Sequence, residues 1–305
     1  MRTDIISATA PALASSPRAG WRAEDIIGGE KRPDFDRRFL PESLARVDAL
    51  DSLSGRERLL LNQIRGHGYL HLVGLAEGVI PPFLRDQART RRDGDGMRCR
   101  ALQRVADEEA EHIDLFRRCA AAVRDGFGTQ CDVVGPAETF SRAVLAHAPL
   151  SVALFVLHLD GMTERHHEGC IRDERGIDRP FARLLRHHWM EEARHATFDA
   201  ALVANLAWGV PEPGIAKALD GYLEIVALFD EELKRQVLLD LAALMKAGGR
   251  RLGEAEHARI EQQQLQAQRW TFIGAGVSHP RFLETVGRLS AAGARRLAGI
   301  APAFC

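Results

Sequence analysis

Apolar residues recur every three or four positions along most of the chain, within stretches rich in Leu, Ala, Arg, Glu and Gln. This period and these residue types favour amphipathic helices. Breakers such as Pro81 and Gly126 mark helix ends, and Pro149 is expected to kink the helix that contains it. The predicted helices span about 54–80, 97–124, 136–172, 180–208, 214–247, 253–272 and 280–297.

The pattern therefore predicts an all-α fold, and the middle of the chain contains almost nothing typical of a strand. The first fifty residues hold Pro11, Pro17, Pro33 and Pro41 and are interpreted as an irregular arm on the surface. No internal repeat or low-complexity linker interrupts 51–305, so this range is predicted to form a single domain.

Two of the predicted helices carry acidic and imidazole side chains on one face. Glu109 and His112 are three residues apart on the second helix, so both project from the same side. His188, Glu192 and His195 follow each other at steps of four and three on the fourth helix, which brings all three to one face.

Glu77 on the first helix and Glu164 on the third stand in mainly apolar stretches. Thirty-two residues separate Glu77 from Glu109 and twenty-eight separate Glu164 from Glu192, and both intervals allow a short turn between antiparallel helices. A Glu from each of two helices and a Glu-x-x-His from each of the other two is the dinuclear metal arrangement of ferritin-like bundles. The sequence therefore predicts a ferritin-like four-helix core with additional C-terminal helices.

The donor set predicts the metal. Four carboxylates balance the charge of two divalent ions, and carboxylate with imidazole but no thiolate favours iron, with manganese as the alternative. A single Glu-x-x-His is common by chance on a charged helical face. Two of them, together with two acids in apolar helices, favour metal binding over that interpretation. Glu164 and His167 form a further Glu-x-x-His, and His167 is interpreted as a neighbour of the site or a surface residue.

The motif set Glu77, Glu109-x-x-His112, Glu164 and His188-x-x-x-Glu192-x-x-His195 resembles the p-aminobenzoate N-oxygenase family of di-iron enzymes. The resemblance covers roughly 60–200, and its distinctive part is the extra His188. It implies that Glu77 and His112 bind one iron, that Glu164, His188 and His195 bind the other, and that Glu109 and Glu192 are shared. It also implies a homodimer that activates O2 as co-substrate and oxidises an amine nitrogen of a small molecule to hydroxylamine, and often on to nitro.

Other dinuclear proteins fit less well. A ribonucleotide reductase small subunit would carry its radical tyrosine where this chain has Phe116, and the only tyrosines are Tyr69 and Tyr222. A desaturase has no place for His188, although a carbon hydroxylase or desaturase-like oxidase remains the alternative activity. A metal-storage or scaffold protein is the non-enzymatic alternative, and iron stoichiometry with O2 turnover would separate these hypotheses.

Overall charge and cysteine content narrow the setting. A formal net charge of -1 gives no reason to expect nucleic acid, and no apolar run is long enough to span a membrane. Five cysteines without a Cys-x-x-Cys pair argue against a disulfide framework and are typical of a reducing cytoplasm. The chain offers no iron–sulfur motif, so the electrons are expected from an external donor.

The candidate substrate contacts are two arginines on the predicted C-terminal helices. Arg259 and Arg269, on the C-terminal helices, are candidates to neutralise a substrate carboxylate, although arginine is more often a solvated surface residue. An arylamine and an amino-acid-derived aliphatic amine are both compatible with the metal motif.

Overall fold

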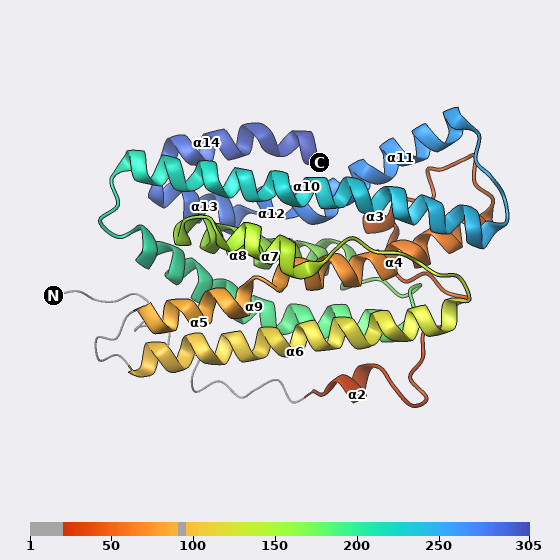
Figure 1. Ribbon diagram of the computed structural model, residues 1–305, viewed down its shortest axis with the longest axis horizontal. Helices are drawn as coiled ribbons and strands as arrows, with labels where there is room; N and C mark the ends of the chain where they lie inside the picture. Colours follow the sequence, from red (N-terminus) through yellow and green to blue (C-terminus); the bar gives the residue numbers. More distant parts are fainter. Residues whose placement is uncertain (1–20, 91–95) are drawn as a thin grey trace.

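The computed structural model describes residues 21–90 and 96–305, and in these ranges the regular elements are helices joined by turns and loops, with no β-strand. The long helices lie side by side along one axis (Figure 1). Helix α4 (Gly55–Glu77) packs on α6 (Gly96–Phe127), and α8 (Pro149–His166) packs on α9 (Arg179–Ala207). Helix α6 also contacts α9, which joins the two pairs. The all-α class and the four-helix core predicted from the sequence are confirmed.

Additional helices surround this four-helix core. Helix α5 (Ile80–Thr90) follows α4 and packs along α6. Helix α10 (Glu212–Gly248) packs against both α4 and α8. The remaining elements are α7 (Ala137–Leu145), α11 (Glu254–Arg269), α12 (Ala275–Val277), α13 (Pro280–Leu289), α14 (Ala291–Ile300), the π-helices η1 (His167–Ile171) and η2 (Trp270–Gly274), and the 3-10 helix η3 (Ala301–Phe304).

The start of α4 agrees with the sequence pattern. The Ser54 side chain accepts a hydrogen bond from the Glu57 backbone N–H, and the Glu57 carboxylate accepts one from the Ser54 N–H. This reciprocal cap satisfies two backbone donors that a helix start leaves unpaired. After Glu77 the chain turns, and Pro81 and Pro82 stand in the first turn of α5, where a missing N–H costs nothing.

Two predicted helices are divided in the structure. Pro149 does not kink a continuous helix but is the first residue of α8, because its fixed φ and missing N–H suit that position. The segment 280–297 forms α13 and α14. Ser290 ends α13 and its side chain accepts the Gly293 N–H at 3.0 Å, which caps α14.

The described part of the N-terminal arm lies partly on the surface, where 28–38 is exposed or half-buried, and partly inside the protein, where 39–41, 44, 45 and 47 are buried. It contains α2 (Ala23–Ile26) and α3 (Glu42–Ala45), and Phe39 and Leu40 are fully buried. The buried amide of Asn62 on α4 accepts both of their N–H groups, at 2.7 and 3.1 Å. Residues 1–20 of the predicted arm lie outside the described residues.

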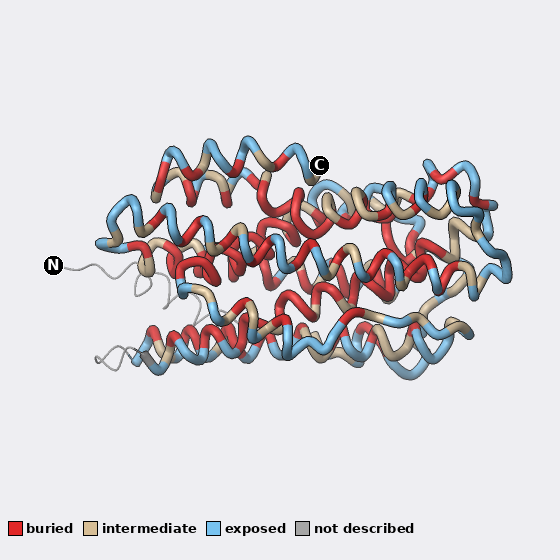
Figure 2. The backbone as a smooth tube through the Cα atoms, turned by 45° about the horizontal axis from the view of Figure 1, so that its top comes forward, coloured by how far each residue is buried: buried red, intermediate tan, exposed pale blue. Residues whose placement is uncertain are grey.

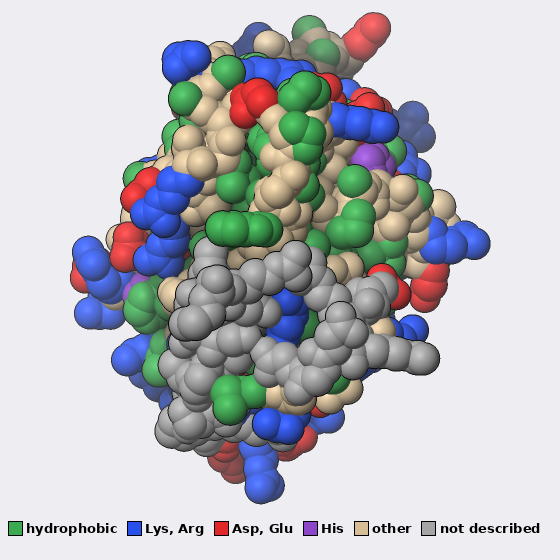
Figure 3. Space-filling view, turned by 90° about the vertical axis from the view of Figure 1, so that its left-hand side faces the viewer, with side chains coloured by type: hydrophobic (Ala, Val, Ile, Leu, Met, Phe, Trp, Pro, Cys, Tyr) green, Lys and Arg blue, Asp and Glu red, His purple; other side chains and the backbone are tan. Residues whose placement is uncertain are grey.

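Helix α8 runs through the middle of the protein, and every residue from 150 to 163 is buried. Figure 2 shows that the buried positions are concentrated between the helices, while the outer faces of the peripheral helices are exposed. In the end view of Figure 3, Lys and Arg side chains stand out around the edge of the molecule. Among the described residues, no helix has the length and apolar character needed to cross a membrane.

Candidate metal centre

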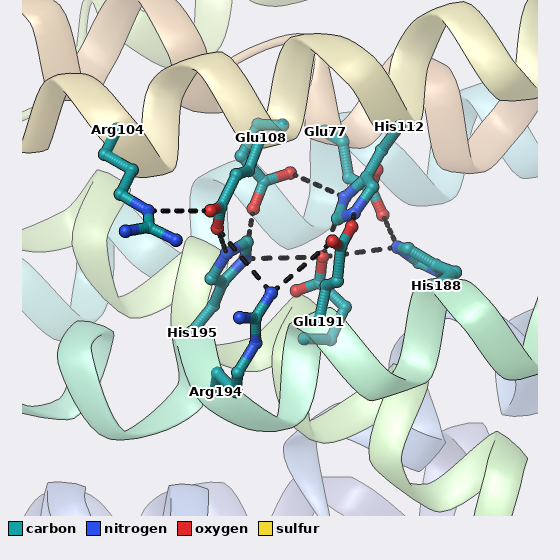
Figure 4. Close-up of polar contacts among 10 residues, drawn as sticks. Glu77, Arg104, Glu108, His112, His188, Glu191, Arg194 and His195 are labelled. Carbon is teal, nitrogen blue, oxygen red and sulfur yellow. Dashed lines mark hydrogen bonds and ion pairs between the residues drawn. The ribbon is translucent and has the colours of Figure 1, made fainter. Parts of the chain in front are cut away.

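Six of the seven residues predicted as metal ligands meet in one buried cluster between α4, α6 and α9 (Figure 4). Each is at most 3% exposed. The six are Glu77, Glu109, His112, His188, Glu192 and His195. Glu77 is the last residue of α4, and the others project from facing sides of α6 and α9. We call these six residues the metal cluster.

Glu192 occupies the middle of the cluster. Its Oε1 lies 3.1 Å from Nδ1 of His112, 3.4 Å from Nε2 of His188 and 3.6 Å from Nδ1 of His195. Glu109 also reaches two imidazoles, with Oε1 at 2.9 Å from Nδ1 of His195 and Oε2 at 3.5 Å from Nδ1 of His112. Both carboxylates are therefore placed where two neighbouring cations could share them.

His188 lies on the Glu77 side of the metal cluster. Its Nε2 is 2.8 Å from Oε1 of Glu77. Its ring lies edge-on to the ring of His112, with the two ring centroids 4.9 Å apart. The family resemblance implied a position beside Glu164 and His195 instead. Glu77 contacts the imidazole because it ends α4 at the level where α9 presents His188.

Two further carboxylates hold the outer nitrogens of the cluster imidazoles. Nε2 of His112 lies 2.6 Å from Oε2 of Glu191, and Nε2 of His195 lies 3.0 Å from Oε2 of Glu108. A carboxylate accepts the N–H at that position, so in the neutral form of each ring Nδ1 would offer its lone pair to a cation in the cluster. Each helix thus contributes a Glu-Glu-x-x-His motif whose first Glu orients the histidine of the other helix.

Two arginines form ion pairs with the carboxylates of Glu108 and Glu191. Nε of Arg104 lies 2.9 Å from Glu108, and Nη2 of Arg194 lies 3.4 Å from Glu191. Burial raises the pKa of Glu108, but the hydrogen bonds from His195 and Arg104 outweigh burial and lower it to about 2. Glu108 is therefore an anion at neutral pH and a strong acceptor for the His195 N–H.

The inner atoms of the cluster lack hydrogen-bond partners even though they are close together. These atoms are Oε2 of Glu77, Oε2 of Glu109, Nδ1 of His112, Nε2 of His188 and Oε1 of Glu192. A buried polar atom without a partner costs about 1–3 kcal/mol, so several in one place require an explanation. Donor atoms of Glu77, His112 and His188 lie within 4.8 Å of one another, as do those of Glu109, His112 and Glu192. Two neighbouring cations bound by these nitrogens and oxygens would satisfy them, and the donor set fits iron or manganese.

Without a cation, the carboxylates of the cluster raise the pKa values of its three imidazoles. Burial lowers the pKa of His188, but the carboxylates of Glu77 and Glu192 outweigh burial and raise it to about 9. Burial likewise lowers the pKa of His112 and His195, and their carboxylate partners raise both well above the ordinary value. At neutral pH these imidazoles hold protons where a metal would bind, so metal binding must release them.

The structure does not bring Glu164, the seventh predicted ligand, to the cluster. Its Oε1 lies 3.3 Å from Nη2 of Arg281 and its Oε2 lies 3.7 Å from Nε2 of His279, so it faces the C-terminal helices. Burial raises the pKa of Glu164, partly offset by Arg281. Glu164 is partly exposed near the end of α8, and its contacts with Arg281 and His279 are those of a structural ion pair.

Asp160, one turn earlier on α8, lies near the cluster, since the charges of Glu192 and His195 both influence its pKa. It is 1% exposed, and neither of its carboxylate oxygens has a hydrogen-bond partner. Burial raises the pKa of Asp160 well above its usual value, and the charges of Asp199 and Glu192 raise it further. Asp199 follows His195 by one turn on α9 and is also buried without a partner. Burial raises the pKa of Asp199 to about 8.

A repeated interval in the sequence could have found Asp160. From Glu77 to Glu109 the interval is 109 − 77 = 32 residues, and from Asp160 to Glu192 it is 192 − 160 = 32 residues. Each interval ends on the second glutamate of a Glu-Glu-x-x-His motif. In the sequence, Asp160 therefore stands in the same relation to Glu192 as Glu77 does to Glu109.

Other predicted residues lie elsewhere. Arg269 binds Asp230 through two contacts of 2.7 Å, and Arg259 is exposed, so neither side chain is held against the cluster. His167 stacks on Trp189 with ring centroids 3.6 Å apart, beside the site rather than in it.

No protein-family model matches this chain, and no curated protein matches it. Among solved structures, the chain is similar to a variant of an R2-like ligand-binding oxidase with an aerobically reconstituted Mn/Fe cofactor. The two chains are 13% identical, the match covers 88% of this chain and 93% of that chain, and the TM-score is 0.48.

Proposed function

We propose that this protein is a di-iron oxygenase that uses O2 to oxidise the amine nitrogen of a small molecule. The proposed ligands are the six residues of the metal cluster together with Asp160, which replaces Glu164 in the set predicted from the sequence. Support comes from the buried donor atoms without partners and from the two 32-residue intervals. Two bound iron ions would supply the electrons that activate O2.

The chain's own residues hold and enclose this site. Glu109 and Glu192 each reach two imidazoles and are proposed to be shared between the ions. Glu108 and Glu191 fix the histidine rings from outside. Trp21 stacks over His112 with ring centroids 6.4 Å apart, and Phe116 meets His188 edge-on at 4.9 Å. These aromatic rings replace water beside the imidazoles, which strengthens electrostatic interactions within the site.

The observation that carries the oxygenase proposal is the third imidazole, His188, at 2.8 Å from Glu77. The rest of the donor set is shared with desaturases, hydroxylases and reductase subunits. His188 adds a neutral donor on the Glu77 side and leaves less room there for other ligands. This is the feature that resembles the p-aminobenzoate N-oxygenase family, and it supports nitrogen as the oxidised atom. An external electron donor and a homodimeric assembly belong to the same proposal.

Product analysis tests the proposal directly. Iron-loaded protein, supplied with a reductant and 18O2, would be incubated with a panel of arylamines and amino-acid-derived amines. The expected result is two irons per chain and 18O on nitrogen, detected by mass spectrometry as hydroxylamine or nitro product. Label in an alcohol would replace this proposal by the carbon hydroxylase, and many irons without O2-dependent product would replace it by metal storage.

The His188→Ala variant tests the role assigned to the third imidazole. It is expected to retain at least one iron and to lose most amine oxygenation, because the Glu77 side loses a donor. The control is His257→Ala, which removes a partly exposed imidazole on α11. If His188→Ala oxygenates amines at the parent rate with two irons bound, the N-oxygenase assignment loses its main support.

A further inference from the structure

Both tyrosines of the chain are buried, and each is hydrogen-bonded to a buried histidine of α8. Tyr69 on α4 is 2% exposed, and its hydroxyl lies 3.2 Å from Nδ1 of His166. Tyr222 on α10 is fully buried, and its hydroxyl lies 2.8 Å from Nδ1 of His158. Neither pair belongs to the metal cluster, although both lie on helices that form the core of the protein.

The backbone determines which atom donates in these pairs. Nε2 of His166 lies 2.8 Å from the carbonyl oxygen of Thr271, which can only accept, so Nε2 carries the hydrogen. Burial lowers the pKa of His166 to about 4, so the ring is neutral and Nδ1 carries a lone pair. The Tyr69 hydroxyl therefore donates to Nδ1, and the three groups form a chain from phenol to imidazole to carbonyl.

Tyr69 lies close enough to the metal cluster to interact with it. Tyr69 and Glu77 are eight residues apart on α4, roughly 12 Å along the helix axis. Burial raises the pKa of Tyr69, and the charge of Glu77 raises it further. His166 is influenced in the same way by His188, which contributes to the lowering of its pKa. The Tyr69–His166 pair therefore stands beside the Glu77 and His188 side of the cluster.

We infer that Tyr69 is a one-electron donor to the O2-oxidised di-metal centre, and that Nδ1 of His166 accepts the phenolic proton as the electron leaves. The inference rests on the proposed function, because the oxidised centre is the oxidant. It assigns a redox role to a residue outside the ligand set.

The O–H bond of Tyr69 breaks, its proton forms an N–H bond at Nδ1 of His166, and its electron reduces the oxidised centre by one equivalent. Tyr69 becomes a neutral tyrosyl radical, and His166 becomes an imidazolium that still donates its Nε2–H to Thr271. An electron from the external donor, with return of the proton from His166, restores the phenol.

The hydrogen bond makes this step feasible in a buried place. Loss of an electron from a buried phenol without loss of the proton would leave a strongly acidic cation in a low-dielectric interior, and an unpaired buried charge is costly. His166 takes the proton over one existing hydrogen bond, because an imidazole with a pKa of about 4 is still far more basic than an oxidised phenol, so the positive charge moves from the tyrosine to the imidazole. The exposure of only 2% at Tyr69 keeps solvent away from the radical.

Tyr222 is a matched control within the same molecule. Nε2 of His158 lies 3.0 Å from the carbonyl oxygen of Phe272, so the second chain has the same chemistry as the first. Burial raises the pKa of Tyr222 well above its usual value, and no carboxylate of the metal cluster contributes to that shift. The two pairs differ in their relation to the metal cluster rather than in their hydrogen bonds.

The first experiment uses iron-loaded protein that is mixed with O2 without substrate, frozen within milliseconds to seconds and examined by EPR. We expect a tyrosyl signal in the parent and in Y222F, and at least tenfold less in Y69F. Ring-deuterated tyrosine must narrow the signal. In high-field spectra the g tensor must show a hydrogen bond to the radical oxygen. A signal that persists in Y69F, or that disappears in Y222F, overturns the assignment to Tyr69.

Replacing the proton acceptor tests the second half of the inference. H166Q can still accept the phenol hydrogen bond but cannot take the proton, so we expect at least a tenfold lower radical yield with Tyr69 in place. Parent protein in D2O should form the radical about two- to fourfold more slowly, a readout that does not depend on any variant folding. Parent-like yield in a folded H166Q protein, or an unchanged rate in D2O, overturns the role of His166.

A metal-free experiment separates this inference from the proposed function. A ruthenium polypyridyl photo-oxidant with a sacrificial electron acceptor replaces the metal as oxidant. The Y222F protein, in which Tyr69 is the remaining tyrosine, should give a hydrogen-bonded tyrosyl signal at least tenfold stronger than that of the Y222F/H166Q protein, and equal signals in the two variants would overturn the role of His166. Iron binding and O2 consumption are measured on the same samples of the parent. Their failure counts against the proposed function, whereas their success without any radical counts against Tyr69 as donor.

Discussion

Asp160 and Glu164 lie one turn apart on α8, and this shift of one turn gives the two carboxylates different neighbours. The two residues differ by only about 40° around the helix but by about 6 Å along it. At the level of Asp160 the neighbours are Glu192 and Asp199, whereas at the level of Glu164 they are Arg281 and His279. One carboxylate therefore faces the metal cluster without partners, and the other forms ion pairs.

The ligand assignment can be tested at this residue scale by two isosteric substitutions. Asp160→Asn is expected to weaken binding of one metal at least tenfold, because the amide supplies no negative charge to the site. Glu164→Gln should leave two metals bound. Metal per chain is measured by mass spectrometry after dialysis at several free iron concentrations. Loss of metal in Glu164→Gln with full binding in Asp160→Asn would reverse the assignment.

At the scale of elements, α6 and α9 organise the site through their matching motifs. The first glutamate of each motif orients the histidine of the other helix, Glu191 for His112 and Glu108 for His195. Both pairs are almost completely buried. The two helices are therefore joined by hydrogen bonds as well as by apolar packing. Separating them by even an ångström would disturb both imidazoles at once.

Glu191→Gln and Glu108→Gln test this exchange between helices. Each variant keeps the shape of the side chain but removes the negative charge that accepts the imidazole N–H. Metal affinity is expected to fall about 10–100-fold, as is usual when a partner of a ligand histidine is removed. Asp114→Asn is the matched control, since Asp114 on α6 is partly exposed and pairs with Arg118. Titration with a metal-competing chelator measures all three, and unchanged affinity in both glutamine variants would contradict the supporting role.

At the scale of the whole molecule, the metal cluster brings negative charges and protonated imidazoles into the core, so stability should depend on metal. Ions that bind only the folded chain stabilise it by about 2.7 kcal/mol at a free concentration of one hundred times Kd. We expect chelation to lower the Tm by roughly 5–10 °C. Calorimetry on loaded and chelated protein measures this, with Glu192→Ala as a control whose Tm should not respond to the chelator. The same Tm for loaded and chelated parent protein would mean that the acids do not share a metal.

The stability of the metal-free protein should also depend on pH. The pKa of His188 is raised to about 9 in the fold, against about 6.5 in the unfolded chain. Its protonation therefore stabilises the metal-free fold fully below about pH 6.5, and this contribution is lost as the pH rises through 9. Urea unfolding should show a loss on the order of 3 kcal/mol between pH 6 and pH 9.5. The loss should be smaller in His188→Gln, and an equal loss in both proteins would contradict the assignment.

The sequence by itself determined the elements and most of the candidate site. Apolar periodicity is a local property, so it located the long helices, including the start of the first one near Ser54, without knowledge of the fold. The spacing within a helix fixes which side chains share a face, which is why Glu109 could be grouped with His112, and Glu192 with His188 and His195, in advance. The division at Pro149 was misjudged, because a proline suits a first turn as well as a kink.

Tertiary structure decided which face of α8 meets the metal cluster and where along its length. Every residue from 150 to 163 is buried, so the helix has no exposed side and its sequence shows no amphipathic stripe to orient it. Periodicity could therefore not choose between Asp160 and Glu164. The packing of α8 against α9, α10, α12 and α13 determined which of these two residues lies near the metal cluster. The same packing determined that His188 meets Glu77 and that Tyr69 meets His166, because such contacts join helices far apart in the sequence.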